Sequence, residues 1–411
     1  MSSFYCREMN VGILTQFYLP EAGAPQARLS DLAARLRDRG HSVTILTAMP
    51  NYPAGRVFDG YGGIVRRERV DNVDVVRTWI WPSRSPRFLP RTLSYLSFTS
   101  SSAAVGAFLL PRLDVLITES PPLSLGLSGL LLSRLRRARW VFNVSDLWPE
   151  SAIVLGVLGE GRAARLAYRL EAMCYRRAWR VSAQTREIRA DIERRFPDVR
   201  TLDFSGGADT ALFDPARRDD DLRRRLLGDA PVVAVYAGLH GIAQGLDVLL
   251  DAAEQLRHRS DLTIAFVGDG PVRHELEASS ARRGLANVRF VGPQPRSLMP
   301  ALLASSDIAI VSVRQGIQAF PSKLYEAMAS GTPIVLVAEG EVVEMVESTG
   351  SGVTVAPGDG MGTARALETL ADDPEQRDRL GAAARRIAVE RYDRRAICDR
   401  FIDALEEAAT R

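Results

Sequence analysis

Short runs of apolar and β-branched residues alternate along the chain with longer segments whose apolar residues recur every three or four positions. The short runs predict buried strands, and the longer segments predict helices with one apolar face. The strands expected in the first half lie at residues 10–15, 42–47, 73–78, 115–118, 140–144 and 180–183, and a helix is expected at residues 27–39. This alternation is typical of a doubly wound α/β domain with a parallel sheet.

The same alternation begins again in the second half. Its strands are expected at residues 232–237, 262–268, 288–291, 308–313 and 334–337. Between the halves, residues 201–219 are rich in Gly, Asp and Arg. We therefore predict two Rossmann-like domains, residues 1–204 and 205–388, that face a ligand cleft with the carboxyl ends of their strands. Residues 389–411 are expected to form a terminal helix that closes back on the first domain.

The composition is that of a soluble globular protein, with 46% hydrophobic and 25% charged residues in a chain of 411. It excludes a disordered chain, a collagen-like chain and a small disulfide-stapled protein. Three scattered cysteines are too few for a disulfide framework or a zinc site, and they fit a reducing, cytoplasmic compartment. The sequence shows no signal peptide and no run of 18 apolar residues, so no membrane-spanning helix is expected.

Charge is divided unevenly between the halves. Residues 1–204 hold 29 Arg against 19 acidic residues, whereas residues 205–411 hold 24 basic against 31 acidic residues. A basic half can face nucleic acid, an anionic membrane surface or an anionic substrate, and it can equally serve solubility alone.

Only one of the 53 basic residues is a lysine, Lys323. It either survives by chance or marks a position that requires a compact ammonium group. Its surroundings, residues 318–335, read QAFPSKLYEAMASGTPIV, where Pro321 is placed to open a helix and Gly331 to end it. The amides of the first helical residues would then point out of the helix, a geometry that binds phosphate together with the ammonium group.

Glu326 follows Lys323 by three residues and lies on the same face of that helix. A carboxylate in this place can accept two hydrogen bonds from a sugar diol. A phosphate site and a diol acceptor on one helix together suggest a nucleotide diphosphate with its ribose.

On these residues the chain resembles the retaining glycosyltransferases of family 4, which have the two-domain GT-B fold. Their hallmark is a pair of Glu residues with seven residues between them, of which the second begins the motif E-A-M-A-x-G-x-P. Glu326 stands at the second position, and Gln318 replaces the first, so it can hydrogen-bond the transferred sugar but carries no charge. Weaker matches at residues 205–213, 266–271 and 288–295 extend the resemblance over nearly the whole chain.

The first donor loop departs from the family pattern. Residues 238–245 read GLHGIAQG, where most relatives carry the Arg and Lys that clamp the diphosphate. The positive charge must then come from Lys323, His240 or backbone amides, although His240 is alternatively a loop histidine bonded to backbone. This loop resembles that of a subgroup that builds bacterial surface polysaccharides, often from amino sugars. The donor-binding residues that the resemblance implies are Gly238, His240, Gly241, Gln244, Gly268, Pro293, Gln294, Phe320, Pro321, Ser322, Lys323 and Glu326.

The resemblance places the acceptor in the first domain. Gly23 lies in a loop that relatives use against the diphosphate and sugar, and a glycine lets backbone approach a ligand closely. Arg28, at the start of the next helix, either holds an anionic acceptor or forms a surface salt bridge. In residues 143–150, NVSDLWPE, Asp146 is retained from the family pattern and either lines the site or caps the following turn. Trp148 and Glu150 complete the proposed acceptor side.

The resemblance implies retaining transfer of a sugar, in this subgroup an N-acetylated amino sugar, from a nucleotide diphosphate, preferably UDP. The acceptor would be a saccharide, a lipid-linked or a small molecule, with no nucleic-acid partner. The catalytic residues expected are Asp146, Gln318, Lys323 and Glu326. Because the helix terminus and Lys323 can stabilise the leaving charge, no metal or other cofactor is expected. The alternatives are a sugar-nucleotide epimerase on the same fold and a non-catalytic nucleotide-sugar-binding protein.

Two apolar segments, residues 93–110 and 123–135, are bordered by arginines. They are either core helices of the first domain or interfacial helices on anionic lipid. Their position between predicted strands favours the core. We therefore expect a cytoplasmic protein with at most a peripheral, salt-sensitive contact with the inner membrane face.

Overall fold

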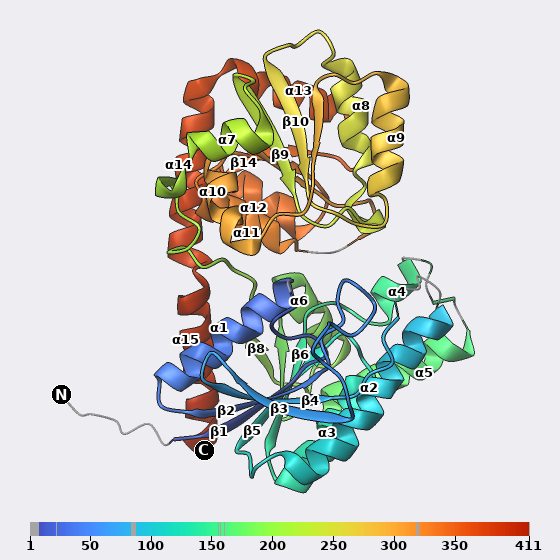
Figure 1. Cartoon of the computed structure of the whole chain (residues 1–411). Coiled ribbons are helices and arrows are strands. Elements are labelled where there is room, and N and C mark those ends of the chain that lie inside the picture. The colour runs from blue at the N-terminus through green and yellow to red at the C-terminus, as the bar shows by residue number, and fades with distance from the viewer. Residues whose placement is uncertain are drawn as a thin grey trace, which may run out of the picture. The chain divides into compact units, whose positions relative to one another are not determined.

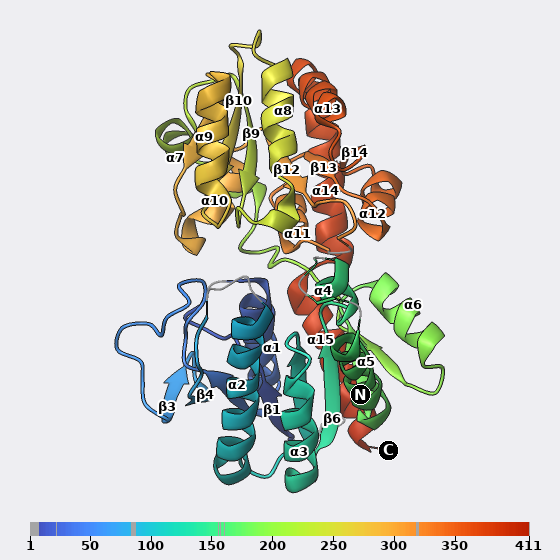
Figure 2. The same cartoon turned by 90° about the vertical axis from the view of Figure 1, so that its right-hand side faces the viewer.

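The computed structural model describes residues 8–21, 23–83, 88–154, 156, 158–159, 161–317 and 320–410. It divides into two compact units, Met1–Ser205 with Arg395–Arg411, and Gly206–Arg394. Each unit is a sheet covered on both faces by helices (Figures 1 and 2). The alternation of strands and helices expected from the sequence is therefore present in both.

The sheet of the first unit has eight strands in the order β3-β4-β2-β1-β5-β6-β7-β8. They are β1 Asn10–Leu14, β2 Ser42–Ala48, β3 Val65–Val70, β4 Val73–Thr78, β5 Val115–Ser120, β6 Arg139–Val144, β7 Arg180–Ala183 and β8 Thr201–Asp203. All neighbours are parallel except β3, which runs antiparallel to β4. The strand order reverses between β1 and β5, so the ligand-binding edge of this sheet lies where these strands end.

Residues on opposite faces of β1 pack under different helices, as the two-residue period of a strand requires. Val11 and Ile13 join the apolar cluster formed with α1 and α15, whereas Leu14 joins the cluster formed with α2 and α3. The helices of this unit are α1 Ala24–Asp38, α2 Phe88–Leu109, α3 Leu125–Arg136, α4 Glu150–Val154, α5 Arg162–Arg177, α6 Arg186–Arg195 and α15 Arg394–Thr410. The apolar segments 93–110 and 123–135 thus lie in α2 and α3 and cover the sheet.

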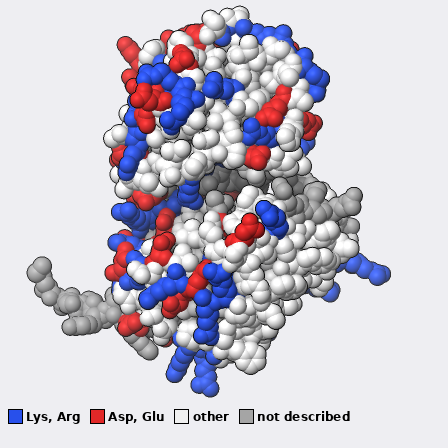
Figure 3. Space-filling model, viewed as in Figure 1, with Lys and Arg blue, Asp and Glu red and all other residues white. Residues whose placement is uncertain are grey.

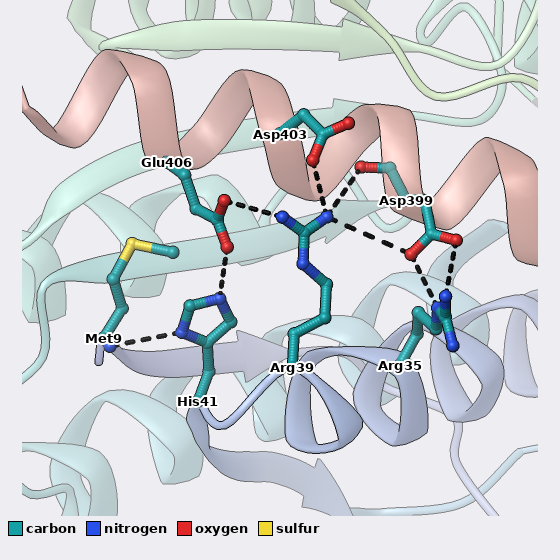
Figure 4. Close-up of polar contacts among 7 residues, drawn as sticks. All are labelled: Met9, Arg35, Arg39, His41, Asp399, Asp403 and Glu406. Carbon is teal, nitrogen blue, oxygen red and sulfur yellow. Dashed lines mark hydrogen bonds and ion pairs between the residues drawn. The ribbon is translucent and has the colours of Figure 1, made fainter. Parts of the chain in front are cut away.

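The terminal helix α15 closes the first unit through both apolar and charged contacts. Phe401 is 1% exposed and stacks on Phe204 with 4.3 Å between ring centroids. On the same helix, three carboxylates face three basic groups that lie at or near the end of α1 (Figure 4). The pairs are Arg35–Asp399 at 2.6 Å, Arg39–Asp403 at 2.6 Å, Arg39–Glu406 at 2.7 Å and His41–Glu406 at 2.8 Å.

The sheet of the second unit has six parallel strands in the order β11-β10-β9-β12-β13-β14. They are β9 Val232–Ala237, β10 Leu262–Val267, β11 Val288–Val291, β12 Ile308–Ser312, β13 Ile334–Val337 and β14 Gly352–Val355. Its helices are α7 Asp220–Leu227, α8 Asp247–Gln255, α9 Arg273–Arg283, α10 Met299–Ala304, α11 Ser322–Ala329, α12 Glu341–Thr349, α13 Gly360–Asp372 and α14 Pro374–Arg391, with short 3-10 turns η1 Pro215–Arg217, η2 Ile242–Gln244 and η3 Arg296–Leu298. Two apolar clusters, one on each face, make up the core.

Three strands escaped the sequence analysis. β3 is an edge strand with three arginines in six residues, so its apolar content is too low for a buried run. β8 has three residues and lies in the polar segment assigned to the join, and β14 has four half-buried residues. Within the described residues, no helix is long and apolar enough to cross a membrane.

Candidate functional site

The switch point of the second sheet lies between β9 and β12, and it brings α11 to the first donor loop. Lys323, in the first turn of α11, extends its Nζ to the hydroxyl of Tyr236 at 2.5 Å and lies 4.1 Å from the centre of that ring. Gly238 is the first residue after β9 and has a φ of +146°. A Cβ at Gly238 would lie 2.9 Å from Lys323 Nζ. Glycine at this position therefore leaves room for the ammonium group beside the loop.

The N-terminus of α11 adds positive potential to that of Lys323. The helix begins at Ser322, directly after Pro321, and no side chain caps it. The amides of its first turn are thus available to an anion, as at other helix N-termini. Burial lowers the pKa of Lys323 to about 7, and the nearby Glu326 opposes that shift. Near neutral pH both the amine and the ammonium form are therefore present, and a bound anion would favour the ammonium form.

Glu326 lies one turn further along α11. Burial raises the pKa of Glu326 above its usual range, while Arg296, Arg394 and Lys323 act in the opposite direction. The sequence analysis did not include either arginine, because they lie 30 or more residues away along the chain in segments without a recognisable motif. Their charges favour the ionised form of the carboxylate that is predicted to bind the ribose.

His240 is completely buried, and within the described structure neither of its ring nitrogens has a hydrogen-bond partner. The alternative of a histidine ring bonded to backbone is therefore wrong. Burial, with Arg273 and Lys323, lowers the pKa of His240 to about 4, so the ring is neutral at neutral pH. It contributes no charge, and its unpaired nitrogens can donate to or accept from a ligand. Of the three sources of positive charge expected near this loop, His240 is therefore removed, and Lys323 and the backbone amides are left.

The other predicted donor residues lie along the same sheet edge. Gly268 has φ +140°, and a Cβ there would lie 2.0 Å from the carbonyl oxygen of Gly238, so only glycine fits. The side chain of Gln244 lies against Gly241, and the main-chain carbonyl of Gln244 accepts a hydrogen bond from Ser312 Oγ at 2.7 Å.

Pro293 and Gln294 lie in the loop that follows β11, and Phe320 lies just before α11. Pro293 is exposed, and Gln294 Nε2 donates to the carbonyl of Gly292 at 3.2 Å. Phe320 stacks on Tyr325 with 5.0 Å between ring centroids. Gln318 lies outside the described residues.

In the first unit, Arg28 is buried and does not form the surface salt bridge that was one alternative. It pairs with Glu119, at the end of β5, over 2.6 Å and donates to Ser145 Oγ at 2.6 Å. Asn143 Nδ2 also donates to Glu119, at 2.6 Å. Because Glu119 neutralises its charge, Arg28 is placed to hold strand ends together. Sequence reasoning missed Glu119, because the strand predicted at residues 115–118 ends one residue before it.

Asp146 accepts a hydrogen bond from Ser151 Oγ at 2.5 Å, so it is tied to the start of α4. Burial raises the pKa of Asp146, and the charge of Arg91 opposes this shift. The structure thus supports the capping alternative and at the same time keeps Asp146 at the carboxyl end of β6, where a ligand site is expected. Glu150 pairs with Arg195 at 3.2 Å, and Trp148 lines an apolar groove described below.

Gly23 precedes α1 with an extended backbone at φ 174°, and a Cβ there would meet only the Gln26 side chain. The fold of this unit therefore does not itself require glycine. The loop before it is shaped by Glu21, whose buried carboxylate accepts from the amides of Asn51 and Tyr52 at 2.8 Å each. The described residues include no group of three or more His, Cys, Asp or Glu that could hold a metal ion.

Two family models match the chain. The model for a glycosyl transferase 4-like domain matches residues 23–203, and the model for glycosyl transferases group 1 matches residues 218–387. The chain is 30% identical over 332 residues to the putative colanic acid biosynthesis glycosyl transferase WcaI of Escherichia coli strain K12, which covers 78% of this chain and 81% of that protein.

Two further likenesses extend over almost the whole length. The chain is 27% identical over 402 residues to the GDP-mannose-dependent alpha-mannosyltransferase of Mycolicibacterium smegmatis, which covers 97% of each. The solved structure of Anabaena HepE with UDP and glucose is similar with a TM-score of 0.72 and 20% identity, over 97% of this chain and 99% of that one. The fold class predicted from the sequence is confirmed.

Proposed function

Because this chain belongs to the group 1 glycosyl transferases and has their GT-B fold, we propose that it moves a sugar, with retention of configuration, from UDP to a lipid-linked acceptor. It is a glycosyltransferase that uses sugar-nucleotide donors. The sugar we propose is an N-acetylated amino sugar, which rests on the resemblance of the first donor loop to that subgroup. The pathway class, polysaccharide biosynthesis, agrees with the relative WcaI.

One observation carries the proposal: the only lysine of the chain lies at the uncapped start of α11, against Tyr236 and the donor loop. When the sugar–phosphate bond breaks, negative charge develops on the diphosphate. The ammonium group and the helix amides are preorganised to stabilise that charge. Electrostatic stabilisation of this kind is usually the largest single contribution to lowering the activation barrier. We propose that no metal ion is required, and that the leaving phosphate itself takes the acceptor's proton.

The preference for UDP is supported by the HepE complex, whereas the mannosyltransferase named above uses GDP-mannose. Binding of UDP, GDP and dTDP sugars, measured by thermal shift and then by calorimetry, separates these donors. We expect a UDP-sugar to raise the melting temperature most, because ligand that binds only the folded state stabilises it. Tighter binding of GDP-mannose would overturn the UDP assignment and leave the glycosyltransferase assignment standing.

Lys323→Ala tests the site directly. We expect the variant to lose at least about tenfold in donor affinity, corresponding to about 1.4 kcal/mol, and to lose more in turnover. Lys323→Arg should retain only part of the wild-type donor affinity and turnover, because a planar guanidinium group replaces a compact ammonium group. Arg365→Ala, at an exposed position of α13 in the same unit, serves as the control. Turnover that persists in excess EDTA supports the metal-free proposal, and loss restored by Mg²⁺ would contradict it.

A further inference from the structure

The outer surface of α2 and α3 is apolar and without acidic residues. Neither helix contains Asp or Glu. Phe108 is 86% exposed, and large side chains with exposed fractions from 36% to 54% follow the same two helices. They are Leu93, Leu96, Leu127, Leu131 and Leu135. In Figure 3 much of this side of the first unit is white, with blue side chains at its margins. A patch of this kind marks an interaction site on a soluble protein.

A groove enters the unit from this surface, between α2 and α5. Its volume is about 250 Å³, and nearly all of its wall is carbon. The side chains that form its wall include Tyr95, Leu96, Leu123, Trp148, Leu166 and Leu170. Leu96 also lines a neighbouring shallow hollow that contains the exposed rings of Trp79 and Trp81. The two depressions therefore lie on either side of Leu96.

One end of the groove is charged and lies close to the predicted acceptor residues. Arg91 lines it, and its Nε donates to the hydroxyl of Tyr95 at 2.6 Å. Burial raises the pKa of Asp146, and the positive charge of Arg91 acts against that rise. Trp148, two residues after Asp146, lines the same groove. Among the described residues that line the groove, Arg91 is the only charged side chain and no carboxylate is present.

We propose that this groove binds the hydrocarbon chain of an anionic lipid, with the phosphate of that lipid beside Arg91. The proposal rests on the proposed function and identifies where its lipid-linked acceptor lies. A peptide is a poorer occupant, because its backbone N–H and C=O groups require partners that a carbon wall does not offer. A hydrocarbon chain requires none, and the surrounding leucines and tryptophans suit the boundary between water and lipid.

The probe is dodecyl phosphate below its critical micelle concentration, titrated calorimetrically into the full chain, with inorganic phosphate as the headgroup alone. We expect dodecyl phosphate to bind and inorganic phosphate not to bind measurably. Ala167→Trp, which fills the groove, should weaken binding at least tenfold, and Arg91→Gln should weaken it severalfold. Met361→Glu, 59% exposed on the other unit, should bind as the wild type does.

Leu166→Glu is the second variant, since a side chain that is 67% exposed can change without disturbing the core. It should also weaken binding while leaving the melting temperature and UDP-sugar affinity unchanged. Wild-type affinity for dodecyl phosphate in both Leu166→Glu and Ala167→Trp would overturn the proposal. Self-association of the lipid-free chain that Leu166→Glu abolishes, without lipid binding, would also overturn it and assign the surface to a second copy. Failure of the wild type to bind any UDP-sugar would instead count against the proposed function alone.

Discussion

Lys323 and Tyr236, 87 positions apart, are joined by a hydrogen bond of 2.5 Å from the ammonium group to the hydroxyl. The same hydroxyl donates to the carbonyl of Leu239 at 2.7 Å. Tyr236 thus connects the start of α11 to the first donor loop, and it holds the ammonium group beside Gly238. Because residues 238–245 contain no Arg or Lys, we take Tyr236 to be the residue that positions Lys323 beside this loop.

Tyr236→Phe keeps the ring beneath Lys323 and removes only the hydroxyl. The ammonium group then loses its hydrogen bond, so we expect UDP-sugar affinity to fall by about 0.5–1.5 kcal/mol. Calorimetry of the donor measures this. Tyr95→Phe, in the other unit, should leave donor affinity unchanged. An unaltered dissociation constant for Tyr236→Phe would show that the hydroxyl does not position Lys323.

The pKa of about 7 for Lys323 predicts a pH dependence of donor binding. An anionic diphosphate favours the protonated amine, so affinity should be constant below pH 7 and fall as the pH rises through that value, by up to about tenfold per unit. A UDP-sugar is the suitable ligand, because its diphosphate does not titrate in this range. Lys323→Ala should show weak affinity without this slope. The same slope in Lys323→Ala would assign the titration to another group.

Glu326→Gln tests the ribose contact and the coupling between two charges of α11. We expect donor affinity to fall by about 1–3 kcal/mol, the range for hydrogen bonds to charged groups. Since the charge of Glu326 raises the pKa of Lys323, the midpoint of the pH dependence should also move to lower pH. Glu344→Gln, on exposed α12, is the matched control. Donor affinity and midpoint equal to those of the wild type would remove Glu326 from the site.

The docking of α15 should depend on its aromatic contact more than on its charges. Phe401→Ala removes a buried ring stacked on Phe204 and should lower the free energy of unfolding of the first unit by about 3–5 kcal/mol. Asp403→Ala removes a carboxylate that is 56% exposed, so its ion pair with Arg39 is expected to contribute less than about 1 kcal/mol. Urea unfolding followed by circular dichroism compares the two. A larger loss for Asp403→Ala would reverse this ranking.

Local pattern in the sequence was sufficient for the main elements of both sheets. Residues 73–78, 180–183 and 288–291 were predicted as strands with the bounds that β4, β7 and β11 have. Pro321 and Gly331 likewise bracket α11, with Gly331 at φ +67°. These predictions succeed because backbone period, helix entry and helix exit depend on residues a few positions apart.

Contacts between distant residues were decided by the tertiary structure alone. The pairing of Arg28 with Glu119, and of Lys323 with Tyr236, joins residues 91 and 87 positions apart. The hydrophobic pattern assigns Tyr236 to a buried strand, and the strand predicted at residues 115–118 ends just before Glu119. Such a pattern reports whether a position is enclosed and not which side chain faces it. The order of strands in each sheet determines those neighbours. The sequence therefore determined the elements, the fold class and the lysine at the start of α11, while the folding of distant segments onto one another decided the partners of that lysine and the groove between α2 and α5.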